Sequence, residues 1–335
     1  MKTKYWIPLL IASAAFLFAS LRKCPLNDKG QSNKSSGALQ SSQQQQTFNQ
    51  NDTSKALRKD SNKKKNYPYA PTDTKQNIRL MSWNIQNFGQ SKDEKEIEYI
   101  AKKLKDMDIV AIQEVSSTFV GPQAVAKLAD ALNRTGSKWL YTVSDPTTGT
   151  GKERYAYLWK PSRARLIGEP FLEKSLADQI EREPYLARFE CKGEKVLLVN
   201  FHAVPQNKNP KQEIALLPSL QNKYPNEKII MMGDFNLSQK DPAFEGIRNK
   251  GLKPALINVK TSLKMRPAPG SPDDYFSEEY DNFYFNPTQI EARSSSRIDF
   301  VRDFRSLEEA RKISDHVPIV LEFVPRAATK DISQR

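Results

Sequence analysis

Polar side chains of the types that bind metal ions and phosphate follow three apolar runs in this chain of 335 residues. Asn84 ends the first run, in Ser-Trp-Asn-Ile-Gln, and Glu114 ends the second, in Ile-Gln-Glu-Val. Asp234 and Asn236 follow the third, in Met-Gly-Asp-Phe-Asn, and residues two apart in an extended segment point to the same side. A carboxylate and an amide on one face can hold a hard cation or a phosphate oxygen, so these residues predict a metal and phosphate centre.

The chain contains two histidines, and both lie at the ends of strand-like runs. His202 follows Val-Asn-Phe, and His316 lies directly after Asp315 in Ile-Ser-Asp-His-Val-Pro. A lone histidine more often has a structural role, but a carboxylate or amide context at both positions favours catalysis. Hydrolysis of a phosphodiester requires a water to lose a proton and a leaving oxygen to gain one, and two imidazoles can serve both needs.

The elements that must position these residues form a mixed pattern of strands and helices, and the 38% hydrophobic content allows a real core. Strands are expected at Ile78–Asn84, Asp108–Val115, Tyr155–Trp159, Lys195–Phe201, Lys228–Met232 and Val317–Phe323. Helices are expected at Asp93–Lys105, Gln123–Leu132 and Pro210–Leu220. Several strand pairs are too close in sequence for crossover helices, so the pattern predicts a largely antiparallel α/β domain with outer helices.

The folded catalytic domain is expected to span residues 78–325, and residues 326–335 are expected to form a frayed tail. Segment 260–297 combines prolines, serines and scattered aromatics. This composition indicates mostly loop, and a long loop would be a natural wall for a site.

Residues 1–23 have the pattern of a signal peptide or a membrane anchor. Two lysines precede an uncharged, mostly apolar run from Tyr5 to Leu21, which only just reaches across a bilayer. The alternative, a buried core helix, would need polar residues at helical spacing on one face. Whether the segment is cleaved or stays as an anchor is open. We therefore expect a secreted or cell-envelope protein whose N-terminal segment engages the secretion machinery or the membrane.

The two cysteines do not support a disulfide framework. Cys24 lies where a lipid-modified cysteine could occur, but Arg22 and Lys23 stand where lipoprotein signals have small residues. Cys191 is the only other cysteine, so the stability of the fold must come from its core.

Residues 24–77 are rich in Ser, Gln, Asn and Lys and predict a disordered linker. Residues 1–77 hold 13 Lys and Arg against 4 Asp and Glu, so they carry +9 of the formal +13 and leave +4 for the rest. The high net charge is therefore weak evidence for a nucleic-acid-binding domain. The basic tail could bind polyanions, and a soluble spacer is an equally good interpretation.

The polar segments occur in an order that resembles a known family. From about Ile78 to Phe323 the chain contains Trp-Asn-Ile, Gln-Glu-Val, Lys-Glu-Arg-Tyr, Arg-Glu-Pro, Phe-His-Ala, Gly-Asp-Phe-Asn, Tyr-Asp and Ser-Asp-His. This order is similar to that of the endonuclease/exonuclease/phosphatase superfamily. Lys-Glu-Arg-Tyr and Arg-Glu-Pro narrow the resemblance to its deoxyribonuclease I family.

The resemblance implies a four-layered α/β sandwich, in which two packed, mixed and largely antiparallel β-sheets lie between helices and the site lies at one end. The implied catalytic residues are His202, His316, Glu153, Asp281, Asp234 and Asn236. The implied phosphate-binding residues are Asn84, Arg182 and Asn236, and the implied metal ligands are Glu114, Asp315 and Asn84.

The resemblance also implies roles for these residues in a metal-dependent endonuclease that cleaves DNA to 5′-phosphate and 3′-hydroxyl ends. Mg²⁺ or Mn²⁺ would lie near Glu114. His316, oriented by Asp281, would act as general base, and His202, oriented by Glu153, as general acid, although these two roles could be exchanged. A carboxylate behind an imidazole fixes its tautomer and stabilises its charged form, which suits both pairs.

Two positions depart from the family pattern. Family members often carry an arginine two residues after the Gln-Glu glutamate that reaches into the DNA minor groove, whereas this chain has Ser116. A family disulfide after Gly-Asp-Phe-Asn is also absent, because Leu237–Lys240 contains no cysteine. This loop must be held in another way, by a structural Ca²⁺ or by packing.

DNA is the expected partner, no protein partner is evident, and a monomer is expected. One alternative is a phosphodiesterase of the same superfamily that acts on sphingomyelin or inositol phosphates, and Lys152–Tyr155 and Arg182 argue against it. The other is a catalytically dead surface module that binds polyanions. Such a module would be expected to have lost site residues, whereas only the groove-contacting arginine is missing here.

Overall fold

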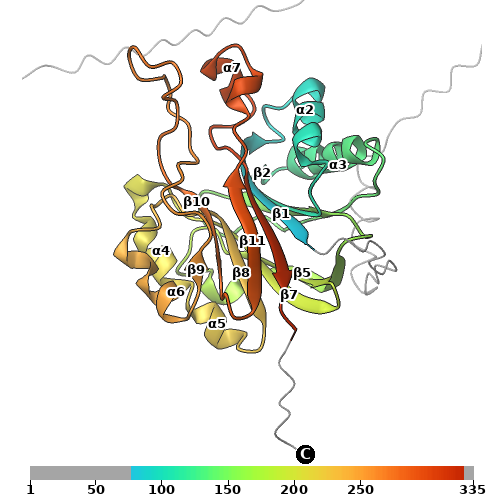
Figure 1. Ribbon diagram of the computed structural model, residues 1–335, viewed down its shortest axis with the longest axis vertical. Helices are drawn as coiled ribbons and strands as arrows, with labels where there is room; N and C mark the ends of the chain where they lie inside the picture. Colours follow the sequence, from blue (N-terminus) through green and yellow to red (C-terminus); the bar gives the residue numbers. More distant parts are fainter. Residues whose placement is uncertain (1–76, 328–335) are drawn as a thin grey trace, which may run out of the picture. The chain divides into compact units, whose positions relative to one another are not determined.

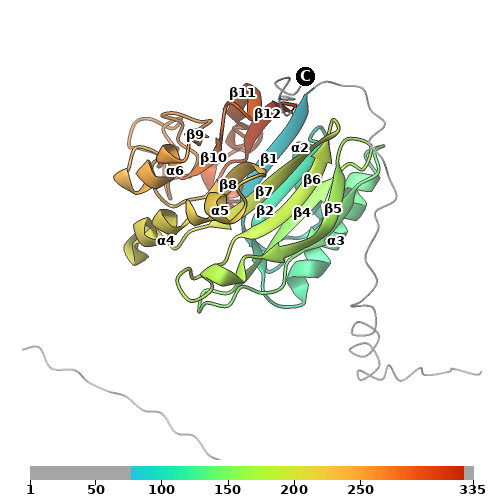
Figure 2. The same ribbon diagram turned by 90° about the horizontal axis from the view of Figure 1, so that it is seen from below.

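The computed structural model describes residues 77–327, which form two packed β-sheets with helices on both outer sides (Figures 1 and 2). The expected leader in residues 1–23, nearly all of the expected linker and the tail from residue 328 onward lie outside the described residues.

The first sheet contains six strands with one parallel pair, β1 with β2. Its other neighbours are antiparallel. In sheet order the strands are β11 (Ile290–Arg297), β12 (Ile319–Pro325), β1 (Ile78–Phe88), β2 (Ile109–Ser116), β4 (Glu153–Trp159) and β3 (Leu140–Val143).

The second sheet also contains six strands, and its one parallel pair is β7 with β8. In sheet order the strands are β5 (Arg165–Leu172), β6 (Tyr185–Cys191), β7 (Glu194–His202), β8 (Lys228–Asp234), β10 (Asp281–Phe285) and β9 (Lys253–Pro254). Two mixed, largely antiparallel sheets between helices confirm the four-layered sandwich predicted from the sequence.

The helices divide between the two outer faces (Figure 2). Against the first sheet pack α2 (Glu94–Leu104), α3 (Val120–Asn133) and α7 (Leu307–Arg311). Against the second sheet pack α4 (Pro210–Leu216), α5 (Ser219–Lys223) and α6 (Glu245–Asn249). Short 3₁₀ turns occur at η1 (Lys174–Leu176), η2 (Gln206–Lys208), η3 (Pro242–Phe244) and η4 (Val301–Asp303). Within residues 77–327, no helix has the length and apolar character needed to cross a membrane.

The layer between the sheets is an aromatic core that includes Tyr157, Trp159, Phe189 and Phe283. Rings from both sheets meet there, such as Trp159 and Phe189, whose centroids lie 5.5 Å apart. A buried aromatic side chain removes a large apolar area from water, so this layer stabilises the pairing of the two sheets. The core replaces the disulfides that the sequence does not provide.

Segment 260–297 is mostly loop, as expected, but it also contains two strands that the sequence did not predict. These are β10 and β11, which lie in its second half. β10 is short and fully buried, so it lacks the alternation that marks a strand in sequence, and β11 is an exposed, serine-rich strand at the sheet edge. The single helix expected at Pro210–Leu220 is two helices, α4 and α5, and Pro218 lies between them.

Candidate active site

The register of the second sheet places three polar residues side by side. Asp234 at the end of β8 pairs with His202 at the end of β7 and with Asp281 at the start of β10. Directly paired residues of neighbouring strands project to the same face of a sheet. The pairing therefore builds one cluster from residues that lie far apart in sequence.

Gly233 allows β7 and β8 to approach closely at this point. Its φ is +137°, and a Cβ added there would lie 1.8 Å from the carbonyl oxygen of Phe201. Any other residue would force the two strand ends apart. The glycine of the Gly-Asp-Phe-Asn motif is thus what lets His202 and Asp234 lie next to each other.

The carboxylate of Asp234 lies between the two histidines. Its Oδ2 atom is 3.5 Å from Nε2 of His202 and 3.5 Å from Nε2 of His316. The same oxygen accepts a hydrogen bond from Nδ2 of Asn84 at 3.1 Å. Burial raises the pKa of Asp234, but the two imidazoles and the hydrogen-bond donors outweigh it and lower the pKa. An ionised carboxylate therefore connects the two imidazoles at the centre of the site.

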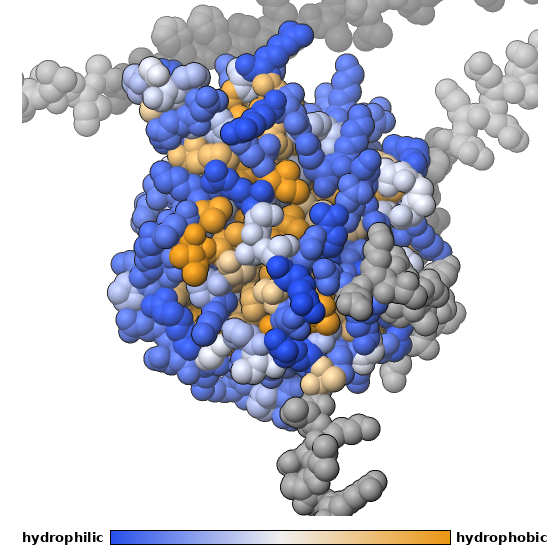
Figure 3. All heavy atoms as spheres, in the orientation of Figure 1, coloured by the Kyte–Doolittle hydropathy of each residue, from blue (hydrophilic) through white to orange (hydrophobic). Residues whose placement is uncertain are grey.

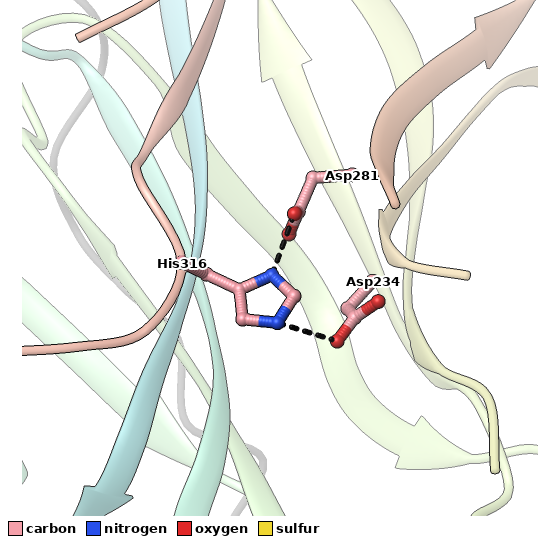
Figure 4. Close-up of side chains that lie close together, drawn as sticks. All are labelled: Asp234, Asp281 and His316. Carbon is pink, nitrogen blue, oxygen red and sulfur yellow. Dashed lines mark hydrogen bonds and ion pairs between the residues drawn. The ribbon is translucent and has the colours of Figure 1, made fainter. Parts of the chain in front are cut away.

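His316 and Asp281 form the first histidine and carboxylate pair (Figure 4). Nδ1 of His316 is 2.7 Å from Oδ2 of Asp281, and the hydroxyl of Thr261 donates to the same oxygen at 2.7 Å. Burial lowers the pKa of His316, but Asp281 and Asp234 outweigh it and hold the pKa well above 6.5. The ring of Tyr280 stacks on His316 with centroids 6.2 Å apart. These contacts fix Nδ1 on Asp281 and leave Nε2 toward Asp234.

His202 and Glu153 form the second pair. Nδ1 of His202 is 2.9 Å from Oε2 of Glu153, and Nη1 of Arg182 donates to that oxygen at 3.1 Å. Burial lowers the pKa of His202, but the Glu153 carboxylate outweighs it and the pKa is raised. Each imidazole is therefore backed by one carboxylate on Nδ1 and faces Asp234 with Nε2.

Arg182 is held against the end of β7. Its Nε donates to the carbonyl oxygen of His202 at 3.2 Å, and its Nη2 donates to that of Ala203. Each terminal nitrogen of a guanidinium carries two N–H groups, so one on each remains for another acceptor. The arrangement positions Arg182 beside His202, where the expected phosphate would have to lie.

Asn84 and Glu114 lie together in the last parts of the parallel strands β1 and β2. Nδ2 of Asn84 donates to Oε1 of Glu114 at 3.0 Å, and the backbone N–H of Asn87 donates to Oε2 at 3.0 Å. Glu114 has a φ of 59° at an irregularity in the pairing of β2 with β4. This strained conformation turns its carboxylate toward Asn84.

Oxygen donors near Glu114 fit a hard cation. Among the described residues, Oδ1 of Asn84 is a buried acceptor with no hydrogen-bond partner. A buried polar atom without a partner is costly unless a ligand satisfies it, and Mg²⁺ or Mn²⁺ prefers carboxylate and amide oxygens. This orphaned oxygen beside a carboxylate is what the expected metal would bind.

Asp315, the third expected metal ligand, already has protein partners. Its Oδ2 accepts from Nε2 of Gln86 at 2.9 Å and lies 3.7 Å from Arg311. Nζ of Lys92 donates to the carbonyl oxygen of Gln86 at 2.8 Å, and burial lowers the pKa of Lys92. Asp315 is thus part of a charged rim next to His316.

A different trio has mutually close ligand atoms. Ligand atoms of Asp234, Asp281 and His316 lie within 4.8 Å of one another, so these three residues could also hold a metal ion (Figure 4). In the part of the chain that the structure describes, this is the only such group of histidine, cysteine and acidic residues. The sequence did not predict this set as ligands.

Asn236 lies beside the site in a left-handed conformation, with a φ of 50°. Its Nδ2 donates to the carbonyl oxygen of Ala203 at 3.0 Å. The loop that follows is held without a disulfide. Ser238 and Lys240 contact Glu279 at 3.1 and 3.3 Å, and Leu237 is buried in the core beneath α4 to α6. Hydrogen bonds, an ion pair and packing therefore anchor this loop.

Two contributing residues were not identified from the sequence. Glu213 of α4 is buried. Its carboxylate accepts the backbone N–H of Glu181, which precedes Arg182, and that of Val204, two residues after His202. Thr261 orients Asp281. Pro210 and Leu217 lie three residues before and four after Glu213 and are buried, so helical spacing could have placed this glutamate on the inner face.

Comparisons with known proteins identify the family of this chain. The model of the "Endonuclease/Exonuclease/phosphatase family" matches residues 81–316. A deoxyribonuclease of Thioalkalivibrio is 26% identical over 76% of this chain and 73% of its own. Dog deoxyribonuclease-1 is 31% identical over 48% of this chain and 60% of its own. A solved family protein of Bacteroides thetaiotaomicron has 18% identity and a TM-score of 0.57, covering 77% of this chain and all of the other.

The fold, the paired histidines and the family match define a hydrolase, and the chain belongs to the endonuclease/exonuclease/phosphatase family. Within that family it is a deoxyribonuclease I-like member.

Proposed function

We propose that this protein is a metal-dependent endonuclease that hydrolyses phosphodiester bonds of DNA to 5′-phosphate and 3′-hydroxyl ends. One observation carries the proposal: two buried imidazoles, each backed by a carboxylate, face the same oxygen of Asp234. The deoxyribonuclease names of the relatives support DNA as the substrate.

The two pairs serve the two proton transfers that the reaction needs. His316 accepts a proton from the attacking water, and Asp281 stabilises the imidazolium that forms. His202 donates a proton to the leaving 3′ oxygen, and the Glu153 carboxylate stabilises the imidazolium that carries this proton; a proton from solvent restores the imidazolium after the step. The geometry is nearly symmetric about Asp234, so the reverse assignment of base and acid uses the same contacts.

Arg182 and the two asparagines position the phosphate in this proposal. The N–H groups that Arg182 does not use for Glu153, His202 and Ala203 donate to a non-bridging oxygen, and Asn84 and Asn236 help to position the phosphate. Preorganised donors of this kind stabilise the charge that develops on the phosphate without having to reorganise.

Asn84, Glu114 and Asp315 are the residues that would hold Mg²⁺ or Mn²⁺. The ion would neutralise charge on the phosphate oxygens. The orphaned Oδ1 of Asn84 supports this location, and we favour it over the Asp234, Asp281 and His316 trio because a metal on His316 would occupy the proton carrier. A structural Ca²⁺ elsewhere remains a further proposal.

The N-terminal segment supports a proposal about location. Residues 1–23 would direct export or anchor the chain, and residues 24–77 would tether the catalytic domain, which acts as a monomer outside the cytoplasm. Fractionation of cells that express the full chain, with N-terminal sequencing of the mature protein, tests whether the segment is cleaved. Recovery of an uncleaved chain in the cytosol would overturn the proposal that residues 1–23 direct export or anchor the chain.

The experiment that tests the function compares several substrates with and without a divalent metal ion. The full chain is incubated with supercoiled plasmid, linear duplex, single-stranded DNA, RNA and sphingomyelin, with Mg²⁺ or with EDTA. We expect metal-dependent nicking of the plasmid. Hydrolysis of sphingomyelin without cleavage of DNA would favour the lipid phosphodiesterase, and DNA binding without any hydrolysis would favour the catalytically dead module.

A further inference from the structure

A groove of about 800 Å³ lies beside α7, outside the site described above. Its walls are the loop of residues 265–275 and the segment of residues 301–311, which project at the same end of the molecule (Figure 1). Strongly hydrophilic side chains extend from this end, with apolar ones between them (Figure 3). The charged residues that line it, here called the arginine groove, are Arg266, Arg302, Arg305 and Arg311, with Asp273 and Glu308.

Two of the four arginines are neutralised by neighbours and two are not. Arg302 forms an ion pair with Asp299 at 3.1 Å, and Arg311 lies 3.7 Å from the carboxylate of Asp315 and donates to the carbonyl oxygen of Leu263 at 2.8 Å. The side chains of Arg266 and Arg305 are exposed and have no ion pair or hydrogen bond within residues 77–327. Their guanidinium groups are therefore available to an incoming anion.

The groove is built from the same segments that hold His316. The backbone N–H of Leu263 donates to the carbonyl oxygen of Asp315 at 2.7 Å, and Ser262 forms a β-bridge with His316. Arg311 spans the two features, because it lines the groove and lies 3.7 Å from Asp315. A ligand in the groove would thus lie on a wall of the catalytic site.

We propose that the arginine groove binds the sugar-phosphate backbone of the DNA strand at a distance from the hydrolysed bond. This inference rests on the proposed function and deepens it. Guanidinium groups bind phosphate in a planar, bidentate geometry, and the volume lies within the usual range of about 300–1,000 Å³ for ligand sites. The groove gives affinity for long strands and adds nothing to the chemistry at the bond.

The test uses the full chain with Arg266 and Arg305 both changed to Ala, and Arg293→Ala as a matched control. Arg293 is an exposed arginine on β11 and does not line the groove. Binding to a labelled 40-base-pair duplex is measured by fluorescence anisotropy in EDTA from 50 to 300 mM salt. Cleavage of 8- and 40-base-pair duplexes with Mg²⁺ is measured in parallel, and thermal melting checks the fold.

We expect the double variant to bind the long duplex roughly tenfold more weakly, with a salt slope lower by about two, because each lost phosphate contact lowers the slope by about 0.9. The KM for the long duplex should rise, with kcat and the short duplex unchanged. If the double variant has the same affinity and salt slope as the control, the arginine groove does not bind DNA and the proposal is wrong. Tight DNA binding that depends on Arg266 and Arg305, without metal-dependent cleavage, would contradict the proposed nuclease function but support DNA binding by the groove. Binding of a poly-glutamate peptide in preference to DNA would assign the groove to an acidic protein partner and overturn the proposal.

A second inference rests on separate contacts around Glu213. Its Oε1 accepts the backbone N–H of Glu181 at 2.7 Å, and its Oε2 accepts that of Val204 at 2.7 Å. The first donor directly precedes Arg182, and the second lies two residues after His202. One buried carboxylate from α4 therefore ties together the two segments that carry the phosphate-binding arginine and the second histidine.

We infer that Glu213 is a positioning residue for the Arg182 and His202 half of the site. It does not reach the reacting atoms, and it acts through the segments that its carboxylate holds. Removal of a hydrogen bond to a charged group costs enough to displace such a segment. The half of the site around Asp281 and His316 does not depend on it.

Glu213→Gln tests this role, because the amide keeps the shape but turns one acceptor into a donor that faces a backbone N–H. We expect kcat to fall about tenfold with KM changed less than twofold, and the NMR signal of His202 to move while that of His316 stays. Glu213→Asp serves if the glutamine variant does not fold, and exposed Glu245→Gln of α6 is the control. A lower melting temperature with kcat intact, or equal shifts of both signals, would show a merely structural role.

Discussion

Changing Asp281 to Asn removes the charge behind His316 and keeps nearly the same shape. The carboxylate is buried and accepts from Nδ1 of His316 at 2.7 Å and from the Thr261 hydroxyl at 2.7 Å, both on Oδ2. The side-chain oxygen of asparagine can still accept both bonds, but its amide would then occupy the Oδ1 position. In the described residues Oδ1 of Asp281 is buried and has no partner, so the new amide interrupts no existing hydrogen bond. The main change is that Nδ1 of His316 faces a neutral acceptor in place of a charged one.

The size of the effect follows from the bond that is weakened. A hydrogen bond to a charged group contributes about 1.5–3 kcal/mol, roughly twice a neutral one. Each 1.36 kcal/mol corresponds to a factor of ten in rate. Loss of most of this stabilisation of the imidazolium should lower kcat by about 10- to 100-fold.

The variant should also move the pH profile in a defined direction. Asp281 and Asp234 hold the pKa of His316 well above 6.5, so a general base at this position loses its proton only at higher pH. In wild type the rate should rise as pH passes through that raised pKa. Without the Asp281 charge the pKa of His316 falls, and the rising limb should shift to lower pH with a lower plateau.

The assay combines the rate from pH 5.5 to 10 with NMR titration of the imidazole signals. The chain has two histidines, so two ring signals are expected, and His202→Ala assigns them. Glu153→Gln is the matched control, because it should move the signal of His202 and leave that of His316. An unchanged titration of His316, or a kcat within twofold of wild type, would refute the role of Asp281.

The remaining predictions concern other parts of the site and the tail. His202→Ala should lower DNA cleavage by about two or more orders of magnitude with circular dichroism unchanged, as expected for loss of a proton carrier; near-normal cleavage would remove it from the mechanism. Glu114→Gln should weaken Mn²⁺ binding by about 10- to 100-fold in calorimetry, whereas unchanged affinity would favour the Asp234 trio as the metal site. Gly233→Ala should lower melting temperature and kcat together because the strand ends clash; a wild-type melting curve would contradict the close approach. Deletion of residues 22–74 should leave kcat unchanged and weaken DNA binding at low salt only; a large kcat loss would show that the tail packs on the domain.

The strand ends that carry the site could be predicted because apolar runs mark buried strands and each run ends in a polar residue. β1, β2, β7 and β8 were expected for this reason, and the structure places His202 and Asp234 at the ends of β7 and β8 and Asn84 and Glu114 in the last parts of β1 and β2, which extend further than expected. Their order matched a known family, which gave the sandwich architecture. Both are properties that a single sequence carries.

The pairing of residues could not be derived from spacing. Asp281 and His316 are 35 residues apart, and only the register of β10 with β8 and the turn before β12 bring them together. β10 was missed because five buried residues within a loop-like segment give no periodic signal. The shared contact of both histidines with Asp234, and the contacts of the Glu213 carboxylate with the segments of Arg182 and His202, depend on packing between layers that sequence patterns do not record.

The central claim, that one histidine activates water and the other protonates the leaving oxygen, is tested most directly by changing the leaving group. His202→Ala and His316→Ala are each assayed on a DNA strand whose bridging 3′ oxygen at one bond is replaced by sulfur, because a thiolate leaves without protonation. We predict that one of the two variants regains near-wild-type cleavage at the sulfur bond while the other stays slow, which identifies the acid and the base. Recovery of both variants, or of neither, would contradict the division of proton transfer between His202 and His316.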